Sequence, residues 1–370
     1  MRILFTGGGT GGHIFPIVAV ARELRNLYPK DDLVLYYIGP KDQSNLKQLQ
    51  QEGFKIHHIV SGKIRNYFSW ENITDFLFKI PAGIFQSFFL LLTIGPRLVF
   101  SKGGTGSLPV TFSAVILGIP VFLHESDIVP GRSNRVTSNW AIKVLISFEK
   151  TEYFNLAKTV LVGNPIKKEL LEGSAESAKE IFNINSPKPV LLFLGGSQGA
   201  QSINEFILSI LNDLLLKYEV IHVAGKNNYE SVKALLPATI NEGLEGYYHL
   251  YPHLGEIELK HAYKISSLII SRAGSASIFE IAAAGKPSIL IPLPSAAQDH
   301  QSKNAYEYAK TGAAVIIEQG NLIPNFFAGR IESLISSDNN LEKMSQAALS
   351  FAKPLAAKAI AREILEYLDE

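Results

Sequence analysis

The chain has 370 residues, of which 46% are hydrophobic and 19% are charged, and this length is enough for two globular domains. A formal charge of +1 at pH 7 gives no reason to expect a nucleic-acid partner. The absence of cysteine excludes disulfides and thiolate metal sites. The sequence starts directly with an apolar strand and shows no signal peptide, so we expect a cytosolic location.

The first predicted element is a strand, because Arg2 to Phe5 is a short apolar run. A glycine-rich segment follows, and Ile14 to Leu24 then carries apolar residues at helical spacing, with Pro16 suited to a first helical turn. Glycine lets the backbone approach a bulky anion, and the N-terminus of a helix attracts negative charge. The segment therefore predicts a strand, a glycine loop and a helix that bind a phosphate.

The kind of phosphate does not follow from the glycines alone. Gly7, Gly9 and Gly12 satisfy the dinucleotide pattern G-x-G-x-x-G, but that pattern also expects an acidic residue at the end of the second strand. The second predicted strand, Leu33 to Lys41, ends instead in glycine and proline, and no Lys-Ser/Thr pair completes a P-loop. Neither nucleotide motif requires His13, which either caps the helix or belongs to an active site.

The stretch Phe76 to Gly95, "FLFKIPAGIFQSFFLLLTIG", is long and apolar enough to resemble a membrane span. It is interrupted by polar residues and lies between α/β units, so a buried helix and a partly exposed, membrane-docking helix are the alternatives. Basic residues around it would suit anionic lipid headgroups or be ordinary solvated side chains. These residues are Lys63, Arg65, Lys79, Arg97 and Lys102.

Apolar strand-like runs then alternate with helical ones, as in a doubly wound parallel sheet. The pattern restarts at Lys188 to Leu211, which again predicts a strand, a glycine loop and a helix. Gly163 to Pro165 is typical of a hinge. We therefore expect an N-terminal domain of residues 1–163 plus 350–370 and a C-terminal domain of residues 164–349.

A third glycine loop is predicted before a helix from about Ser277 to Ala284, with Gly274 opening the loop. Glu280 lies in the early turns of this helix, where it either interacts with the helix dipole or accepts both hydroxyls of a ribose. Farther on, His300 and Gln301 are expected on a loop before a helix, where they could bind sugar hydroxyls.

Four motifs in this order and spacing resemble the MurG family, glycosyltransferase family 28: "GGTGGHIFP", "GGSQGA", "SRAGSASIFEIAAAGKP" and "DHQSKNA". The resemblance spans nearly the whole chain. It implies the GT-B fold, an α/β architecture of two Rossmann-like domains facing across a cleft, with a returning C-terminal helix at "LAAKAIAREILEYL". It also implies transfer of N-acetylglucosamine (GlcNAc) from UDP-GlcNAc to undecaprenyl-diphosphate-MurNAc-pentapeptide, the step from lipid I to lipid II of peptidoglycan synthesis.

The resemblance assigns two sets of binding residues. In the donor set, Ser197 meets the diphosphate, Glu280 holds the ribose, and His300 and Gln301 contact the sugar. The residues expected near UDP-GlcNAc are Thr10, Gly11, Gly12, His13, Asp127, Lys167, Ser197, Gln198, Gly274, Ser275, Ala276, Ser277, Glu280, His300 and Gln301. The residues expected near the acceptor diphosphate are Gly8, Gly9, Thr10, Gly11, Gly12, Gly103 and Gly104.

The expected mechanism is an inverting displacement by the acceptor's C4 hydroxyl. His13 is the leading general base, because an imidazole titrates near working pH, and Asp127 is the alternative. Three departures from the family pattern stand out: Asp127 replaces a common asparagine, Lys167 a usual arginine and Thr105 a commoner aromatic residue. In addition, His300 replaces a glutamine found in some members. We expect Asp127 to pair with Arg132 or Arg135.

No cofactor and no metal are expected, because the sequence has no D-x-D motif or clustered ligands. The expected location is peripheral, on the cytoplasmic side of the inner membrane, with cell-wall synthesis proteins as further partners. Three other readings remain: a different GT-B enzyme such as a diacylglycerol glycosyltransferase, a UDP-GlcNAc 2-epimerase, and a dinucleotide oxidoreductase or plain nucleotide-binding module.

Overall fold

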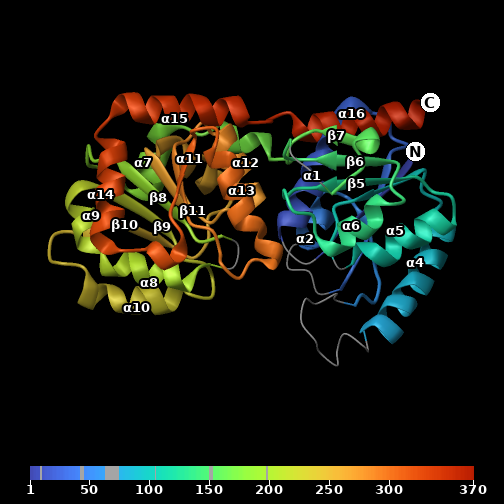
Figure 1. Ribbon diagram of the computed structural model, residues 1–370, viewed down its shortest axis with the longest axis horizontal. Coiled ribbons are helices and arrows are strands. Elements are labelled where there is room, and N and C mark those ends of the chain that lie inside the picture. The colour runs from blue at the N-terminus through green and yellow to red at the C-terminus, as the bar shows by residue number, and fades with distance from the viewer. Residues whose placement is uncertain (9–10, 42–45, 63–74, 105, 150–152, 197–198) are drawn as a thin grey trace. The chain divides into compact units, whose positions relative to one another are not determined.

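The computed structural model describes residues 1–370 except 9–10, 42–45, 63–74, 105, 150–152 and 197–198 (Figure 1). The chain divides into two compact units, the first formed by Met1–Lys167 with Lys353–Glu370 and the second by Lys168–Ala352. Each unit is built on one parallel sheet. The predicted fold class, two Rossmann-like doubly wound domains, is confirmed.

The sheet of the first unit has seven strands in the order β3-β2-β1-β4-β5-β6-β7. The strands are β1 (Arg2–Thr6), β2 (Val34–Gly39), β3 (Lys55–His58), β4 (Leu98–Ser101), β5 (Val121–Glu125), β6 (Lys143–Ile146) and β7 (Thr159–Leu161). The helices are α1 (Gly11–Leu27), α2 (Leu46–Gln51), η1 (Asp75–Lys79), α4 (Ile80–Ile94), α5 (Ser107–Ile116), α6 (Arg132–Ser138), η2 (Leu156–Lys158) and α16 (Ala356–Asp369).

The sheet of the second unit has six strands in the order β10-β9-β8-β11-β12-β13. The strands are β8 (Val190–Leu194), β9 (Glu219–Val223), β10 (Tyr248–Tyr251), β11 (Leu268–Ser271), β12 (Ser288–Leu290) and β13 (Ala314–Ile316). The helices are η3 (Lys168–Leu171), α7 (Ala175–Phe182), α8 (Gln201–Ser209), α9 (Leu211–Lys217), α10 (Tyr229–Thr239), η4 (Glu245–Tyr247), α11 (Glu256–Ile265), α12 (Ser275–Ala283), η5 (Ala297–Asp299), α13 (His300–Ala309), η6 (Gln319–Asn321), α14 (Pro324–Ile335) and α15 (Asp338–Phe351).

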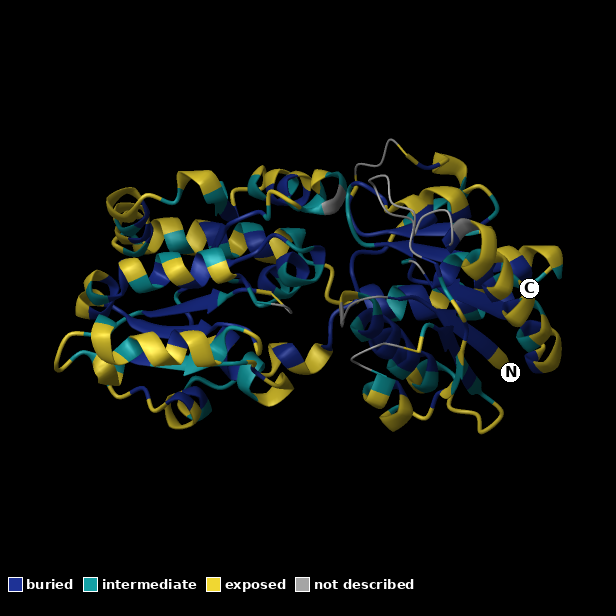
Figure 2. Ribbon diagram, turned by 90° about the horizontal axis from the view of Figure 1, so that it is seen from below, coloured by how far each residue is buried: buried dark blue, intermediate teal, exposed yellow. Residues whose placement is uncertain are grey.

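The central strands are apolar because helices cover both faces of each sheet, so neither face meets water. In β1, Phe5 belongs to a buried cluster with residues of α1 and α16, whereas its neighbour Leu4 belongs to a second cluster with residues of α4 and α5. Figure 2 shows this division, with dark blue strands inside and exposed residues on the outer faces of the helices.

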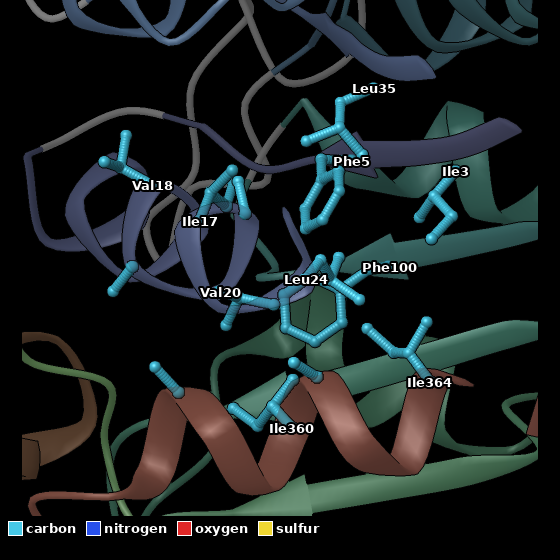
Figure 3. Packing of buried hydrophobic residues seen from close by; sticks show 14 of the residues in the cluster. Ile3, Phe5, Ile17, Val18, Val20, Leu24, Leu35, Phe100, Ile360 and Ile364 are labelled. Carbon is cyan, nitrogen blue, oxygen red and sulfur yellow. The ribbon is translucent and has the colours of Figure 1, made fainter. Parts of the chain in front are cut away.

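The last helix, α16, packs against α1 of the first unit. Its buried residues include Ile360 and Ile364, which belong to the same apolar cluster as Phe5 and Phe100. Figure 3 shows Ile360 and Ile364 pointing from α16 toward Phe100. The C-terminal segment therefore completes the core of the unit that contains the N-terminus.

The apolar segment from η1 through α4 is only partly buried. Gly83, Ser87, Leu91 and Ile94 form the buried face of α4, which packs against α5. Large apolar side chains on the other face are exposed: Leu77, Phe78, Phe85, Phe89 and Leu92. The reading of this stretch as a buried helix is therefore wrong for most of its length, because only 22% of Leu77–Ile94 is buried. Among the described residues, this stretch is the one helical segment long and apolar enough to cross a membrane, a judgement that rests on length and composition alone.

The predicted basic fringe around this segment needs correction. Lys102 is only 1% exposed, so it cannot contact a lipid surface. Lys79 forms an ion pair with Asp75, at 2.6 Å, and Arg97 donates a 2.6 Å hydrogen bond to the carbonyl oxygen of Leu368. Lys63 and Arg65 lie outside the described residues.

Both sheets have the same switch in strand order. The chain runs outward from β1 to β3 and then returns to β4, and likewise from β8 to β10 and then to β11. In such sheets ligands bind beyond the carboxyl ends of the strands at the switch. The segments after β1 and β4, and after β8 and β11, are therefore the places to look for sites.

Candidate active site

Two glycine loops meet at the switch point of the first unit. The amide of Gly8, after β1, donates a 3.1 Å hydrogen bond to the carbonyl oxygen of Gly103, after β4. Gly104 has φ +89°, and a Cβ there would lie 2.6 Å from the carbonyl oxygen of Gly8. Only glycine fits at such a contact, so the two loops present bare backbone side by side. Gly9, Thr10 and Thr105 lie outside the described residues.

Helix α1 begins at Gly11, three residues before the predicted start at Ile14. Gly12 and His13 therefore belong to its first turn, where the helix dipole carries partial positive charge. The His13 side chain is partly exposed. The structure thus places His13 at the anion-attracting end of α1, beside the glycine loops.

Lys102 follows β4 directly, and sequence reasoning gave it no role in the site. Its Nζ atom is buried and has no hydrogen-bond partner among the described residues. Burial lowers the pKa of Lys102 from 10.5 to about 8, although the negative charges of Glu125 and Asp127 favour the charged form. The first unit therefore holds a buried cation at its switch point.

Glu125 ends β5 and is the second buried charge that sequence reasoning missed. Its Oε1 accepts a 2.9 Å hydrogen bond from the amide of Asp127, and its Oε2 accepts bonds from Nδ2 of Asn134, at 2.7 Å, and the amide of Gly131, at 3.2 Å. Burial, and next the nearby charge of Asp127, raise the pKa of Glu125 to about 7. Glu125 orders the loop that carries Asp127, and the pairing of Asp127 with Arg132 or Arg135 stays a prediction.

Lys167 belongs to the first unit, although the sequence placed it with the donor site of the C-terminal domain. Its side chain is buried, and Nζ lies 4.3 Å from the ring centroid of Phe15 on α1. This is the geometry of a cation–π contact. The ammonium is therefore held next to the helix that carries His13.

The glycine loop after β8 lies at the switch point of the second unit. Gly199 has φ +78°, and a Cβ there would lie 2.5 Å from the carbonyl oxygen of Ala224. The amide of Gly199 donates a 3.0 Å bond to the carbonyl oxygen of Gly196. Ser197 and Gln198, the predicted diphosphate contacts, lie outside the described residues.

Helix α12 begins at Ser275, two residues before the predicted start at Ser277, with Gly274 at its N-cap. Ser275, Ala276 and Ser277 therefore form its first turn. Glu280 lies one turn farther along and is partly exposed, and its Oε2 accepts a 2.9 Å hydrogen bond from the hydroxyl of Tyr263 on α11. The structure thus brings Gly274 to Ser277 and Glu280 together at one helix end.

Arg272, between β11 and α12, is a buried residue that sequence reasoning also missed. Its Nη1 donates 3.2 Å bonds to the carbonyl oxygens of Ile291 and Pro292. Its Nη2 donates to Oε1 of Gln319, at 2.7 Å, and to the hydroxyl of Ser202, at 3.3 Å. This guanidinium links the segment after β12 to the start of α8 and so fixes both sides of the switch point.

His300 and Gln301 were predicted on a loop, but they are the first two residues of α13. The side-chain oxygen of Gln301 accepts a 3.0 Å hydrogen bond from the amide of Leu293. The turn before the helix is tight, with φ +55° at Gln298 and +56° at Asp299. A group of three or more His, Asp or Glu side chains able to hold a metal ion does not occur among the described residues.

Family models and relatives match both halves of the chain. The glycosyltransferase family 28 N-terminal domain matches residues 3–146, and the C-terminal domain of that family matches residues 190–360. A relative from Clostridium kluyveri is 37% identical over 354 residues, which cover 95% of this chain and 96% of the relative. It is named UDP-N-acetylglucosamine–N-acetylmuramyl-(pentapeptide) pyrophosphoryl-undecaprenol N-acetylglucosamine transferase.

Solved structures of other proteins also match this chain over nearly its whole length. The crystal structure of Acinetobacter baumannii MurG has a TM-score of 0.75 and 26% sequence identity, and the match covers 99% of both chains. A UDP-GlcNAc 2-epimerase from Neisseria meningitidis has a TM-score of 0.68 over 99% of this chain and 100% of its own, but at 15% identity it shares the fold alone. The protein belongs to glycosyltransferase family 28.

Proposed function

We propose that the protein is an inverting glycosyltransferase that transfers GlcNAc from UDP-GlcNAc to the C4 hydroxyl of MurNAc in undecaprenyl-diphosphate-MurNAc-pentapeptide. The observation that carries this function is the nearly full-length match to relatives named for the same reaction. The geometry agrees, since each unit has a glycine loop and a helix N-terminus at its switch point. Both substrates carry a diphosphate, and such loops stabilise phosphate groups.

The donor belongs in this proposal to the second unit. The loop with Ser197 and Gln198 and the first turn of α12 contact the diphosphate and the nucleotide. Glu280 accepts the ribose hydroxyls, because its carboxylate lies one turn inside α12 and is partly exposed. His300 and Gln301 contact the donor sugar from the start of α13.

The acceptor belongs to the first unit, where the paired loops of Gly8 and Gly103 take its diphosphate. His13, at the start of α1, removes the proton from the attacking hydroxyl. Negative charge then develops on UDP as it leaves, and backbone amides near Ser197 stabilise it, assisted by Lys167. Lys167 belongs to the first unit, where its ammonium lies 4.3 Å from the ring centroid of Phe15, two residues after His13.

The exposed apolar side chains of η1 and α4 support peripheral binding to the membrane that carries the acceptor. Phe85, Phe89 and Leu92 lie on the face of α4 that is turned to solvent, and Val115 and Ile116 of α5, the helix packed against α4, are exposed as well. We place the protein on the cytoplasmic side of the inner membrane, next to other proteins of cell-wall synthesis.

One experiment separates this function from its rivals: UDP release from UDP-GlcNAc, measured with and without a soluble lipid I analogue. Release that depends on the analogue, together with a disaccharide product, is expected. Release without acceptor, or epimerisation of the sugar, would favour a 2-epimerase. Release that depends on diacylglycerol in place of the analogue would favour a different GT-B enzyme.

A further inference from the structure

Tyr263 is a buried residue that contacts α12, the helix proposed to bind the nucleotide in the second unit. It lies on α11, is 1% exposed, and belongs to the apolar cluster that contains Phe182, Leu192 and Ile281. Its ring is therefore held in place by the apolar core. Its hydroxyl donates a 2.9 Å hydrogen bond to Oε2 of Glu280.

The bond joins two residues that are 17 positions apart in the sequence and lie on different helices, α11 and α12. Glu280 is carried by α12, and a glutamate side chain has three rotatable bonds that must be ordered before it can bind a ligand in one geometry. Tyr263 is held by the core and has only two, so its hydroxyl is a rigid anchor for the carboxylate. Burial, and next the charge of Glu280, raise the pKa of Tyr263 well above its usual value of 10, so the hydroxyl stays protonated and keeps donating.

We propose that Tyr263 is a positioning residue for the donor nucleotide: its hydroxyl fixes the carboxylate of Glu280 in the orientation that accepts the ribose diol. This rests on the proposed role of Glu280. A carboxylate has about four acceptor positions, so a bond from Tyr263 is compatible with two further bonds from ribose hydroxyls. Ordering the carboxylate before the nucleotide arrives lowers the entropy cost of binding.

The test is the affinity of the full-length protein for UDP and for 2′-deoxy-UDP, measured by calorimetry. Glu280→Ala should weaken UDP binding at least tenfold, and Tyr263→Phe should weaken it about fivefold. With 2′-deoxy-UDP, which lacks one of the two hydroxyls, the Tyr263→Phe effect should shrink to less than twofold. In the Glu280→Ala background, Tyr263→Phe should have no further effect, because the anchored group is gone.

Tyr248→Phe is the matched control. Tyr248 is a buried tyrosine of the same unit, and its hydroxyl lies 2.6 Å from Nδ1 of His222 on the neighbouring strand β9. Removing this hydroxyl deletes a buried hydrogen bond without touching Glu280, so UDP affinity should stay at the wild-type value. If Tyr263→Phe does not fold, Tyr263→Met also removes the hydroxyl and adapts its shape to the core.

The outcomes separate this inference from the proposed function. Wild-type UDP affinity in Glu280→Ala would overturn the ribose assignment and the inference with it. A loss in Glu280→Ala with no loss in Tyr263→Phe would leave the function standing and overturn the inference. Equal losses for UDP and 2′-deoxy-UDP in Tyr263→Phe would mean a structural role only, which also overturns it.

Discussion

Replacing Lys102 by methionine should stabilise the first unit. Burial lowers the pKa of Lys102 from 10.5 to about 8, so at pH 7 the folded protein holds an ammonium that water would solvate better. Each tenfold change in proton affinity corresponds to about 1.4 kcal/mol, which makes the cost of the buried charge roughly 3 kcal/mol. Methionine has a similar length and no charge, and imperfect packing offsets part of the gain. We expect the free energy of unfolding to rise by about 2 kcal/mol.

The pH dependence gives a second readout with a defined sign. The pKa of Lys102 is lower in the folded state, so its destabilising effect is fully present below pH 8. As the pH rises from 8 toward 10.5, the folded protein loses the proton first, and the wild type recovers stability. The difference in stability between Lys102→Met and the wild type should therefore shrink across this window.

Calorimetry at pH 7 should show a rise of about 5 °C in the melting temperature of the first unit. Lys47→Met, at an exposed position on α2 of the same unit, is the control and should change little. A Lys102→Met protein that folds normally but melts at or below the wild-type temperature would refute the reasoning, because it would mean that the ammonium is well solvated or paired in the folded state.

His13→Ala should lower turnover about a hundredfold and leave UDP-GlcNAc affinity unchanged, which steady-state kinetics and calorimetry together would measure; near-normal turnover would leave His13 a structural role. Asp127→Asn should change turnover less than about tenfold, and a larger loss than in His13→Ala would make Asp127 the base. Burial and the charge of Asp127 raise the pKa of Glu125 from 4.5 to about 7 in the folded state, so the free energy of unfolding should fall as the pH rises from 4.5 to 7. Asp127→Asn removes one cause of this shift and should therefore make the fall smaller. Phe85→Ser with Phe89→Ser should reduce sedimentation with anionic vesicles but preserve turnover of a soluble acceptor, whereas Ile257→Ser, at an exposed site in the second unit, should bind vesicles normally.

The sequence predicted the architecture well because the central strands have a distinct chemical signature. A parallel strand covered on both faces is apolar along its whole length, as in "RILFT" of β1 and "VLLFL" of β8. Helix starts were placed too late, at Ile14 instead of Gly11 and at Ser277 instead of Ser275. Glycine and serine have low helix propensity, but a first turn needs little propensity and favours small residues that leave the amides accessible.

The partners of buried charges were not predictable in the same way. Lys102 follows an apolar strand and precedes two glycines, and nothing in that pattern distinguishes a lysine that turns to solvent from one that turns inward. Tyr263 and Glu280 meet only because α11 and α12 pack on the same sheet. Local sequence gives the residue types at a switch point, whereas tertiary contacts decide which of them are buried and which are hydrogen-bonded.

The two switch points carry buried cations at equivalent positions, but the hydrogen bonding of these cations differs. Lys102 and Arg272 are each the first residue after the strand to which the chain returns, β4 in one sheet and β11 in the other, and both are buried. The guanidinium of Arg272 donates to two backbone carbonyl oxygens, to the side-chain oxygen of Gln319 and to the hydroxyl of Ser202. These bonds join separate segments of its own unit. Lys102 makes no hydrogen bond through Nζ among the described residues and retains its positive charge next to the loops proposed for the acceptor diphosphate. An arginine suits the first task because its planar fork satisfies several acceptors at once, and a lysine suits the second because a compact charge can act on an anion without a fixed geometry.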